Sequence, residues 1–342
     1  MIYAMPEEPW AVHDDHFHRI RDPSEKLKFL LNYAVMAPSI YNTQPWLFRV
    51  TGSEVAMYVD RARALPIADP QGRNLVLSCG AALFNLRIAI RYFGYEPVIR
   101  TFPDFDVADL LAFVRLGRPK QATDEEQDLF AAIRERRTVR SRFLSKVVEP
   151  DLIQHIQKET GQEGAHLHVI QDDAQQSELL EVIREAHKVR SCDGKFVRER
   201  STWVHAHQTH YAPPRNGGTA LLEGVFDSSD VIFRGLDPDQ LQTYEEELLG
   251  SGPVFVVLST KGDNLPAWLS AGQALGRLLL TATHAGLNAA FLNHPVGIKH
   301  LRDRVAALTG EPLHPQMILR IGYGIPGTPT RRQPVLRVTS DG

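Results

Sequence analysis

Apolar residues recur at helical spacing in two long stretches of the sequence, residues 72–94 and 266–286. Each stretch is closed by a glycine, which is a usual residue at the end of a helix. The two stretches also align at a constant offset, with the matching pairs Ser78 and Ser270, Gly80 and Gly272, Ala82 and Ala274, Leu83 and Leu275, Leu86 and Leu278, and Gly94 and Gly286. A glycine inside a helix costs about 1 kcal/mol unless something packs closely against it. We therefore predict two long helices that approach each other at the paired internal glycines.

The elements around these helices repeat in the same order. The corresponding segments are a helix after Pro23 and one after Pro150, strands at 47–50 and 166–170, strands at 97–102 and 289–292, and strands at 113–117 and 319–322. A charged helical stretch at 124–136 joins the two copies. The pattern predicts an α+β fold of two fused lobes, residues 1–120 and 121–342, each a small sheet flanked by helices. The two long central helices are expected to pack together.

Composition narrows the class of protein. The chain has 342 residues, 43% of them hydrophobic and 23% charged, which is typical of a soluble globular protein. A net charge of −3 provides no basic field for nucleic acid. No run of 18 apolar residues and no signal-like N-terminus is present, so we expect a cytoplasmic protein that is neither secreted nor inserted in a membrane. The two cysteines, Cys79 and Cys192, form no CxxC pair and are expected to be free thiols.

A polar loop is predicted at residues 37–46, between a helical pattern and an extended one. Pro38 cannot continue the helix, and Pro45 is expected to hold the residue before it in an extended conformation. The side chains that this loop would fix next to one another are those of Ser39, Asn42 and Gln44. Such donors and acceptors suit the edge of a flat polar heterocycle, whereas the simpler interpretation is an ordinary Asn/Ser/Pro turn.

The sequence of this loop resembles the signature loop of the FMN-dependent nitroreductase family, where such side chains hold the isoalloxazine ring. The resemblance implies that Pro38, Ser39, Asn42 and Gln44 bind FMN. It also implies that the two lobes are nitroreductase-like, so that one chain imitates the family's homodimer. The single-chain arrangement is similar to the Acg-like NAD(P)H nitroreductases associated with mycobacterial dormancy.

Two basic segments carry further resemblance. Residues 136–140 read Arg136-Arg137-Thr138-Val139-Arg140, and their guanidiniums suit a phosphate or a polarised carbonyl oxygen. They are similar to an Arg-Arg-Ser-x-Arg segment that grips FMN in the family; alone, they could equally form a solvated basic turn. Near the C-terminus, Arg331 and Arg332 resemble the family's terminal basic segment, which also reaches the phosphate.

The two halves carry complementary parts of a site. The first half has the polar loop but no Arg-Arg-Thr motif before its first helix, and the second half has the arginines but no Pro-Ser-x-x-Asn loop between 156 and 166. In the homodimeric family each flavin takes the loop from one subunit and the arginines from the other. We therefore expect one composite FMN site per chain.

The family often presents a backbone amide to flavin N5 from a Glu-Gly pair. The matching place here reads Phe291-Leu292-Asn293-His294, which departs from that pattern. We expect the amide to come from Leu292 or Asn293, and the departure leaves the hydride-transfer geometry open.

Residues 187–235 show no sustained period and contain several aromatic residues, including Trp203, Tyr211 and Phe226. A long segment of this kind is typical of a functional lid, and the resemblance implies an ordered lid over the flavin. Histidines cluster twice, at positions 13, 16 and 18 and at positions 205, 207 and 210. Neither cluster matches a closed zinc pattern, so no metal site is expected.

The resemblance implies an oxidoreductase in which NAD(P)H, as a transient hydride donor, reduces FMN. A nitroaromatic, quinone or related small molecule then takes the electrons in a ping-pong cycle, and no protein acid or base is needed. The alternative is a flavin-sequestering or sensing protein with a closed lid and little turnover. A monomer suffices for one flavin site, the sequence leaves higher oligomers open, and neither nucleic acid nor membrane is an expected partner.

Overall fold

The computed structural model describes residues 6, 8–104, 106–139, 143–208 and 253–341, without the side chains of 204–208. In chain order the first-lobe elements are α1 (Pro23–Ala34), β1 (Trp46–Thr51), β2 (Glu54–Val59), α2 (Arg73–Tyr92), β3 (Tyr95–Thr101), β4 (Leu110–Pro119) and the connecting α3 (Asp124–Glu135). The second-lobe elements are α4 (Pro150–Gly161), β5 (His166–Ile170), α5 (Asp173–Cys192), α6 (Gly194–Gln208), β6 (Val254–Thr260), α9 (Leu265–His284), β7 (Asn288–Phe291), α10 (Lys299–Thr309) and β8 (His314–Gly322). The chain closes with α11 (Val335–Val338) and β9 (Thr339–Asp341).

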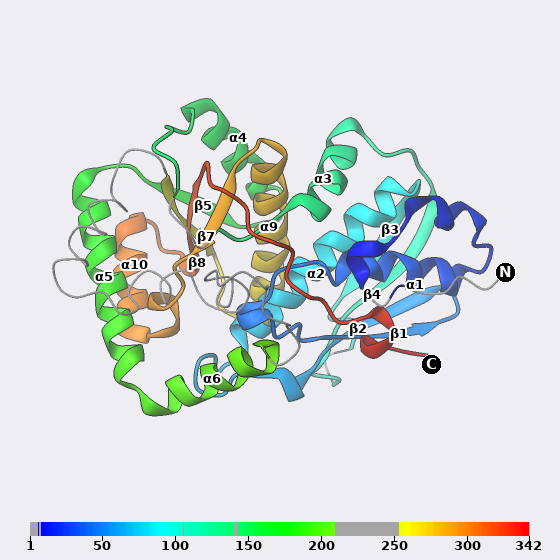
Figure 1. Ribbon diagram of the computed structural model, residues 1–342, viewed down its shortest axis with the longest axis horizontal. Coiled ribbons are helices and arrows are strands. Elements are labelled where there is room, and N and C mark those ends of the chain that lie inside the picture. Colours follow the sequence, from blue (N-terminus) through cyan, green and yellow to red (C-terminus); the bar gives the residue numbers. More distant parts are fainter. Residues whose placement is uncertain (1–5, 7, 105, 140–142, 209–252, 342) are drawn as a thin grey trace, which may run out of the picture.

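The two sheets confirm the internal duplication. The first has the strand order β3-β4-β2-β1-β9 and the second β5-β6-β8-β7, which is the same succession when it is read from the other end. All neighbouring strands are antiparallel except β9, which pairs in parallel with β1. The chain therefore returns from the second lobe to complete the sheet of the first (Figure 1).

Local sequence signals place the helix ends. Both α1 and α4 begin at a proline, Pro23 and Pro150, where the missing N–H is not needed. Both long helices are followed by a left-handed glycine, Gly94 at φ 85° and Gly286 at φ 75°. These four residues reproduce the predicted boundaries of the repeated unit.

The long helices α2 and α9 lie together in the middle of the molecule, between the two sheets (Figure 1). Their backbones meet at Gly80 and Gly272, where a Cβ added to either glycine would lie 2.8 Å from the Cα of the other. The predicted close approach is confirmed. Helix α2 is long and apolar enough to span a membrane, but 89% of its most apolar window is buried, so its composition reflects its place in the core.

Residues 187–235 show no sustained period in the sequence, yet their first part is helical. Residues 187–192 complete α5, and α6 continues to Gln208. Residues 209–235, with Tyr211 and Phe226, lie outside the described part of the chain, as do the side chains of His205, His207 and His210. Both cysteines are free thiols, as predicted, and burial raises the pKa of the Cys79 thiol.

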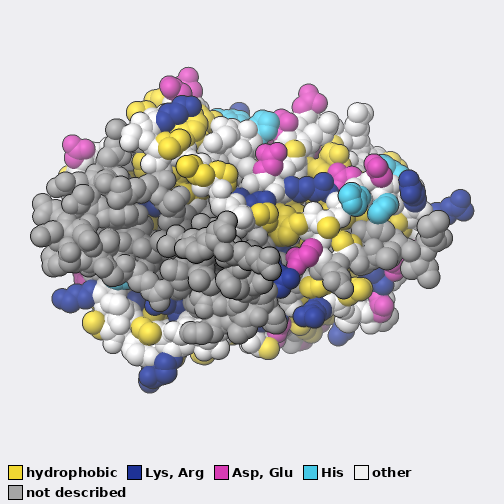
Figure 2. Space-filling model, in the orientation of Figure 1, with side chains coloured by type: hydrophobic (Ala, Val, Ile, Leu, Met, Phe, Trp, Pro, Cys, Tyr) yellow, Lys and Arg dark blue, Asp and Glu magenta, His cyan; other side chains and the backbone are white. Residues whose placement is uncertain are grey.

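Basic and acidic side chains are interspersed over the coloured part of the face in Figure 2. The described surface visible there carries no continuous basic area of the kind that binds a polyanion.

We predict that Gly272→Ala will lower the free energy of unfolding by about 3 kcal/mol, because the added methyl group meets the backbone of α2 and not a movable side chain. Gly161→Ala is the matched control, since a Cβ there has no neighbour within 4 Å. The control should change stability by no more than about 1 kcal/mol. Urea unfolding followed by far-UV circular dichroism measures both, and equal midpoints would contradict the close helix contact.

Candidate functional site

The predicted polar loop has a strained backbone. Three of its non-glycine residues adopt positive φ angles: Tyr41 at 46°, Asn42 at 55° and Gln44 at 51°. Gln44 is therefore left-handed, and the expectation that Pro45 keeps it extended is wrong. The Ser39 hydroxyl accepts a hydrogen bond of 2.9 Å from the Gln44 amide and helps to hold this conformation. A non-glycine residue in the left-handed region of φ/ψ space costs of order 1–3 kcal/mol of conformational energy, and such residues are concentrated at functional sites.

The Asn42 and Gln44 side chains bind the C-terminal segment. Asn42 donates to the Arg331 carbonyl at 3.0 Å and accepts from Arg332 at 3.1 Å. The Gln44 side-chain oxygen accepts from the Gln333 amide at 2.8 Å, and its Nε2 donates to the Asn42 carbonyl at 3.3 Å. The structure thus brings the loop and the terminal arginines together, as the sequence predicts. It also shows that these two amide side chains are engaged in holding residues 331–333.

Trp10 joins the two basic segments. The guanidinium of Arg137 lies 4.9 Å from the centre of the Trp10 ring, and that of Arg332 lies 5.5 Å from it. The Trp10 indole also donates to the Thr330 carbonyl at 2.9 Å. An arginine from the second lobe and one from the C-terminal segment therefore meet on a single ring beside the polar loop.

Arg137 is a half-buried cation that forms no ion pair with a carboxylate in the described part of the chain. Its guanidinium donates to the carbonyl oxygens of Arg134 and Arg136, each at 2.8 Å, and stacks on Trp10. Burial lowers its pKa, and the negative charge of Glu135 acts in the opposite direction. A cation in this position favours an anionic or strongly polarised ligand.

The other predicted site residues differ in how far they are exposed to solvent. Arg136 is buried at the end of α3, and Arg332 is buried against the loop, whereas Arg331 is exposed and pairs with Glu8 at 3.3 Å. Thr138 forms an isolated parallel bridge with Ala289, which places the arginine segment beside β7. Pro38 is partly exposed at the start of the loop, and Arg140 lies outside the described residues.

The backbone amide of Leu292 is already in use. It donates to the Ile318 carbonyl at 2.9 Å, and Leu292 is buried. The Asn293 side chain accepts from the Ile318 amide at 2.9 Å, so both residues extend the edge of the second sheet. Of the two residues expected to present a backbone amide to the flavin, Leu292 or Asn293, Leu292 has its amide bound within the protein.

Helix α6 extends from the second lobe beneath the loop (Figure 1). Phe196 packs in one cluster with Tyr41 of the loop and with Leu65. The Glu199 carboxylate accepts from the amides of Ile67 and Ala68 at 2.9 and 2.8 Å, which fastens the helix to the first lobe. The first part of the predicted lid is thus a helix that covers the loop.

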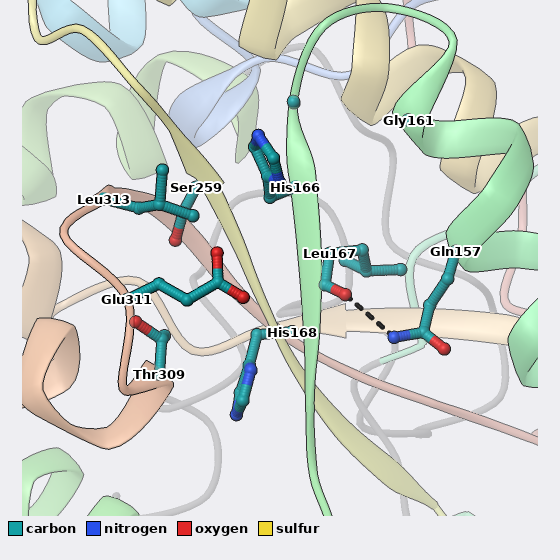
Figure 3. Close-up of a pocket in the computed structure, with 10 residues that line it drawn as sticks. Gln157, Gly161, His166, Leu167, His168, Ser259, Thr309, Glu311 and Leu313 are labelled. Carbon is teal, nitrogen blue, oxygen red and sulfur yellow. Dashed lines mark hydrogen bonds between the residues drawn. The ribbon is translucent and has the colours of Figure 1, made fainter.

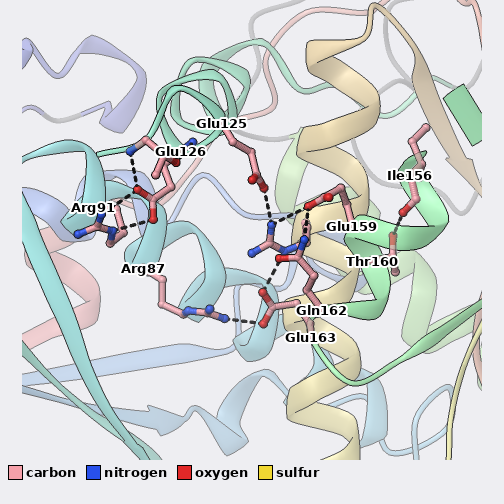
Figure 4. Close-up of polar contacts among 11 residues, drawn as sticks. Arg87, Arg91, Glu125, Glu126, Ile156, Glu159, Thr160, Gln162 and Glu163 are labelled. Atoms are coloured by element: carbon pink, nitrogen blue, oxygen red, sulfur yellow. Dashed lines mark hydrogen bonds and ion pairs between the residues drawn. The ribbon is translucent and has the colours of Figure 1, made fainter. Parts of the chain in front are cut away.

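The segment of the second lobe that corresponds to the polar loop is closed by ion pairs. The Glu163 carboxylate, whose side chain is 7% exposed, binds Arg87 of α2 at 2.6 Å and Arg277 of α9 at 3.0 Å. Arg277 also binds Glu125 at 2.8 Å and Glu159 at 3.3 Å (Figure 4). The place where a second loop would stand is filled by carboxylates that bind both central helices.

Three polar groups at the loop were not among the residues predicted from the sequence, although Thr43 lies within the predicted loop and Gln333 follows the terminal arginines. Trp10 belongs to an N-terminal segment without a motif. The Gln333 Nε2 and the Thr43 hydroxyl are buried and have no hydrogen-bond partner in the described structure. Buried polar atoms without partners are uncommon and indicate that a ligand or water completes them.

The comparisons with known proteins show the family to which the chain belongs. Residues 133–323, more than half of the chain, match the model of the Nitroreductase family. The protein named "Putative NAD(P)H nitroreductase Rv3131" from Mycobacterium tuberculosis is 30% identical over 342 residues, which cover 97% of this chain and 95% of that one. The chain belongs to the Nitroreductase family. The protein named "Uncharacterized protein Rv3127" from the same organism is also 30% identical, over 90% of this chain and 91% of its own length.

Two solved structures show partial similarity to this family member. The FMN-dependent nitroreductase NfnB from Mycobacterium smegmatis, in complex with NADPH, is 19% identical with a TM-score of 0.38, over 59% of this chain and 89% of that one. A nitroreductase-type protein from Anabaena variabilis is 11% identical with a TM-score of 0.48, over 93% and 91% of the two chains.

We predict that Glu163→Gln will lower the free energy of unfolding by about 3 kcal/mol, because it leaves the buried Arg277 and the partly buried Arg87 with less compensation. Glu96→Gln is the control, since the pair of Glu96 with Arg118 is exposed and should be worth about 1 kcal/mol or less. Chemical unfolding of the two variants checks the difference. Similar losses in both would show that the ion pairs between the lobes are dispensable.

Proposed function

We propose that this chain is an FMN-dependent oxidoreductase with one flavin site, built from the polar loop, the arginine segment and the C-terminal segment. The observation that carries the proposal is Arg137. It is a half-buried guanidinium with no carboxylate partner among the described residues, beside a strained loop and stacked on Trp10. The family membership and the names of the relatives support it.

The chemistry of the available groups fits FMN. A phosphate and a ring with several acceptor atoms require charged and neutral donors in one place. Arg137 and the exposed Arg331 supply positive charge, and the unpaired Gln333 Nε2 and Thr43 hydroxyl supply neutral hydrogen bonds. Arg136 and Arg332, which are buried beside them, add to the positive field.

The roles of the loop residues follow from their contacts. Asn42 and Gln44 fix Arg332 and Gln333, so they act on the flavin through the C-terminal segment, and Ser39 keeps the loop in shape. Bound FMN would supply the two-electron redox chemistry. The protein holds the cofactor, and helix α6 limits the approach of solvent to the loop.

For the reaction we propose NAD(P)H as the hydride donor and a nitroaromatic, quinone or related small molecule as the acceptor, in a ping-pong cycle. Several relatives carry names that refer to NAD(P)H nitroreductases. The contact of Phe196 with Tyr41 is the observation behind a second candidate, a protein that holds FMN under a closed cover with little turnover.

We predict one FMN per chain, because Glu163 and its partners occupy the equivalent place in the second lobe. Flavin released by heat from saturated protein, measured against protein concentration, should approach a ratio of one. A ratio near two would contradict the composite site, and a protein that takes up no flavin would contradict the proposed function.

Stopped-flow mixing with NADPH then separates the two candidates by the loss of flavin absorbance near 450 nm. Complete reduction on the time scale of turnover supports the reductase. A flavin that stays oxidised while it remains bound supports the sequestering protein.

We predict that Arg137→Ala will weaken FMN binding ten-fold or more, because a hydrogen bond to a charged group contributes about 1.5–3 kcal/mol. Arg331→Ala should cost less, since Arg331 is exposed and already pairs with Glu8. Arg118→Ala, which is exposed and distant in the first sheet, is the matched control and should leave the dissociation constant unchanged. Fluorescence titration measures all three, and an unchanged constant for Arg137→Ala would show that the arginine segment is a solvated turn.

A further inference from the structure

A second site lies in the other lobe, at the end of its sheet. A cavity of about 280 Å³ opens between β5, β6 and the turn after α10. The residues that define its chemistry are His166, His168, Ser259, Thr309 and Glu311 (Figure 3). None of them belongs to the proposed flavin site, and the inference does not depend on that proposal.

The cavity belongs to the outer face of the second sheet. Leu167 points toward the core shared with α9, so His166 and His168, its neighbours on either side, point to the opposite face. In Figure 3 the side chains of His168, Ser259 and Glu311 lie on one side of β5, and Gln157 lies on the other. The corresponding face of β1 in the first lobe is exposed at Leu47, so this cavity is a feature of the second lobe.

Two buried polar atoms line the cavity without a partner. Ser259 is 1% exposed, and its hydroxyl makes no hydrogen bond in the described structure. The same holds for Nε2 of His168, which is also buried. A buried hydroxyl without a partner costs about 1–3 kcal/mol, so a native fold retains it where something else completes it.

A β-bulge sets the position of Ser259. The pairing of β6 with β8 shifts register between Leu258 and Ser259, so that Ser259 faces Pro315, which has no N–H to give. Bulges commonly re-aim a side chain next to a functional site. Regular strand pairing is therefore interrupted at Ser259, the residue whose hydroxyl has no hydrogen-bond partner in the described structure.

The charge around the cavity favours a cation. Glu311 contributes a carboxylate to the lining, and no lysine or arginine is among the described residues that line the cavity. The C-terminal ends of α4 and α10, at Gly161 and Thr309, also border it and add partial negative charge. In the described part of the chain no group of three or more His, Cys, Asp or Glu side chains could hold a metal ion.

We propose that this cavity binds a small organic ammonium ion, a primary amine in its protonated form. Such a group has three N–H donors. The cavity offers three acceptors to match them: the Glu311 carboxylate, the Ser259 hydroxyl oxygen and the open Nε2 of His168. The volume leaves room for a short carbon chain on the ammonium.

Saturation-transfer NMR with methylammonium as the probe tests this proposal on the full chain. Wild-type protein should give a saturable signal that ethylammonium competes away. Ser259→Ala and Glu311→Gln should each weaken binding five-fold or more, while Glu149→Gln, an exposed carboxylate outside the cavity, should leave it unchanged. Glu311 is exposed, so its variant is expected to fold, and thermal unfolding of Ser259→Ala checks that this variant keeps the fold.

Two comparison probes define the chemistry that is recognised. Tetramethylammonium carries the same charge without N–H donors, and acetate carries the opposite charge; both should bind at least ten-fold more weakly than methylammonium. The absence of any methylammonium signal overturns the proposal. So does a signal that survives both cavity variants, or tetramethylammonium or acetate binding of equal strength.

Discussion

The contact between α2 and α9 is the constraint on which the rest of the structure depends. At Gly80 and Gly272 the two backbones touch with no side chain between them. A methyl group on either residue would meet backbone atoms, which cannot rotate away as a side chain can. This approach fixes two lobes that could otherwise pack at a range of distances. The loop of one lobe and the arginines of the other are then held at a constant separation.

The asymmetry of the molecule arises at one pair of equivalent segments. After α1 the chain forms a strained polar loop whose amide side chains bind the returning C-terminus. After α4 it forms a short turn that places the Glu163 carboxylate between Arg87 and Arg277. The polar loop leaves hydrogen-bond donors without partners in the described structure, whereas the charges at the turn after α4 pair with one another. One fold repeated twice can therefore carry a ligand site in one copy and a structural ion-pair cluster in the other.

Much of the fold could be predicted because its signals are local. The prolines at Pro23 and Pro150 begin helices, the glycines Gly94 and Gly286 end them, and the internal glycines indicated the close helix contact. Local patterns say nothing about partners that are distant in the sequence, such as Trp10 and Thr330, which are 320 residues apart. Trp10 enters the site only through such contacts, so no motif could have found it.

The helical start of the predicted lid was missed for a related reason. Among the described side chains of residues 187–203, Phe196 is the one buried apolar side chain. Polar contacts add to it, since Arg190 donates to the Gly297 carbonyl at 3.0 Å and the Glu199 carboxylate accepts from the amides of Ile67 and Ala68. A segment held mainly by polar contacts shows little hydrophobic periodicity. The polar loop itself was predicted from the sequence. Its left-handed backbone was not, because the residues with positive φ are not glycines.

The contacts of Asn42 and Gln44 indicate that these two side chains position other residues of the candidate site. A side-chain amide that binds a ligand directly must give up its hydrogen bonds to water, and it is free to rotate until the ligand arrives. Here the side-chain amides of Asn42 and Gln44 are already hydrogen-bonded to residues 331–333, so their conformations are fixed before a ligand binds. The strain of the loop is then offset by protein contacts, and a ligand meets guanidinium and amide donors whose positions are set in advance. Pre-organisation of this kind reduces the entropy lost on binding.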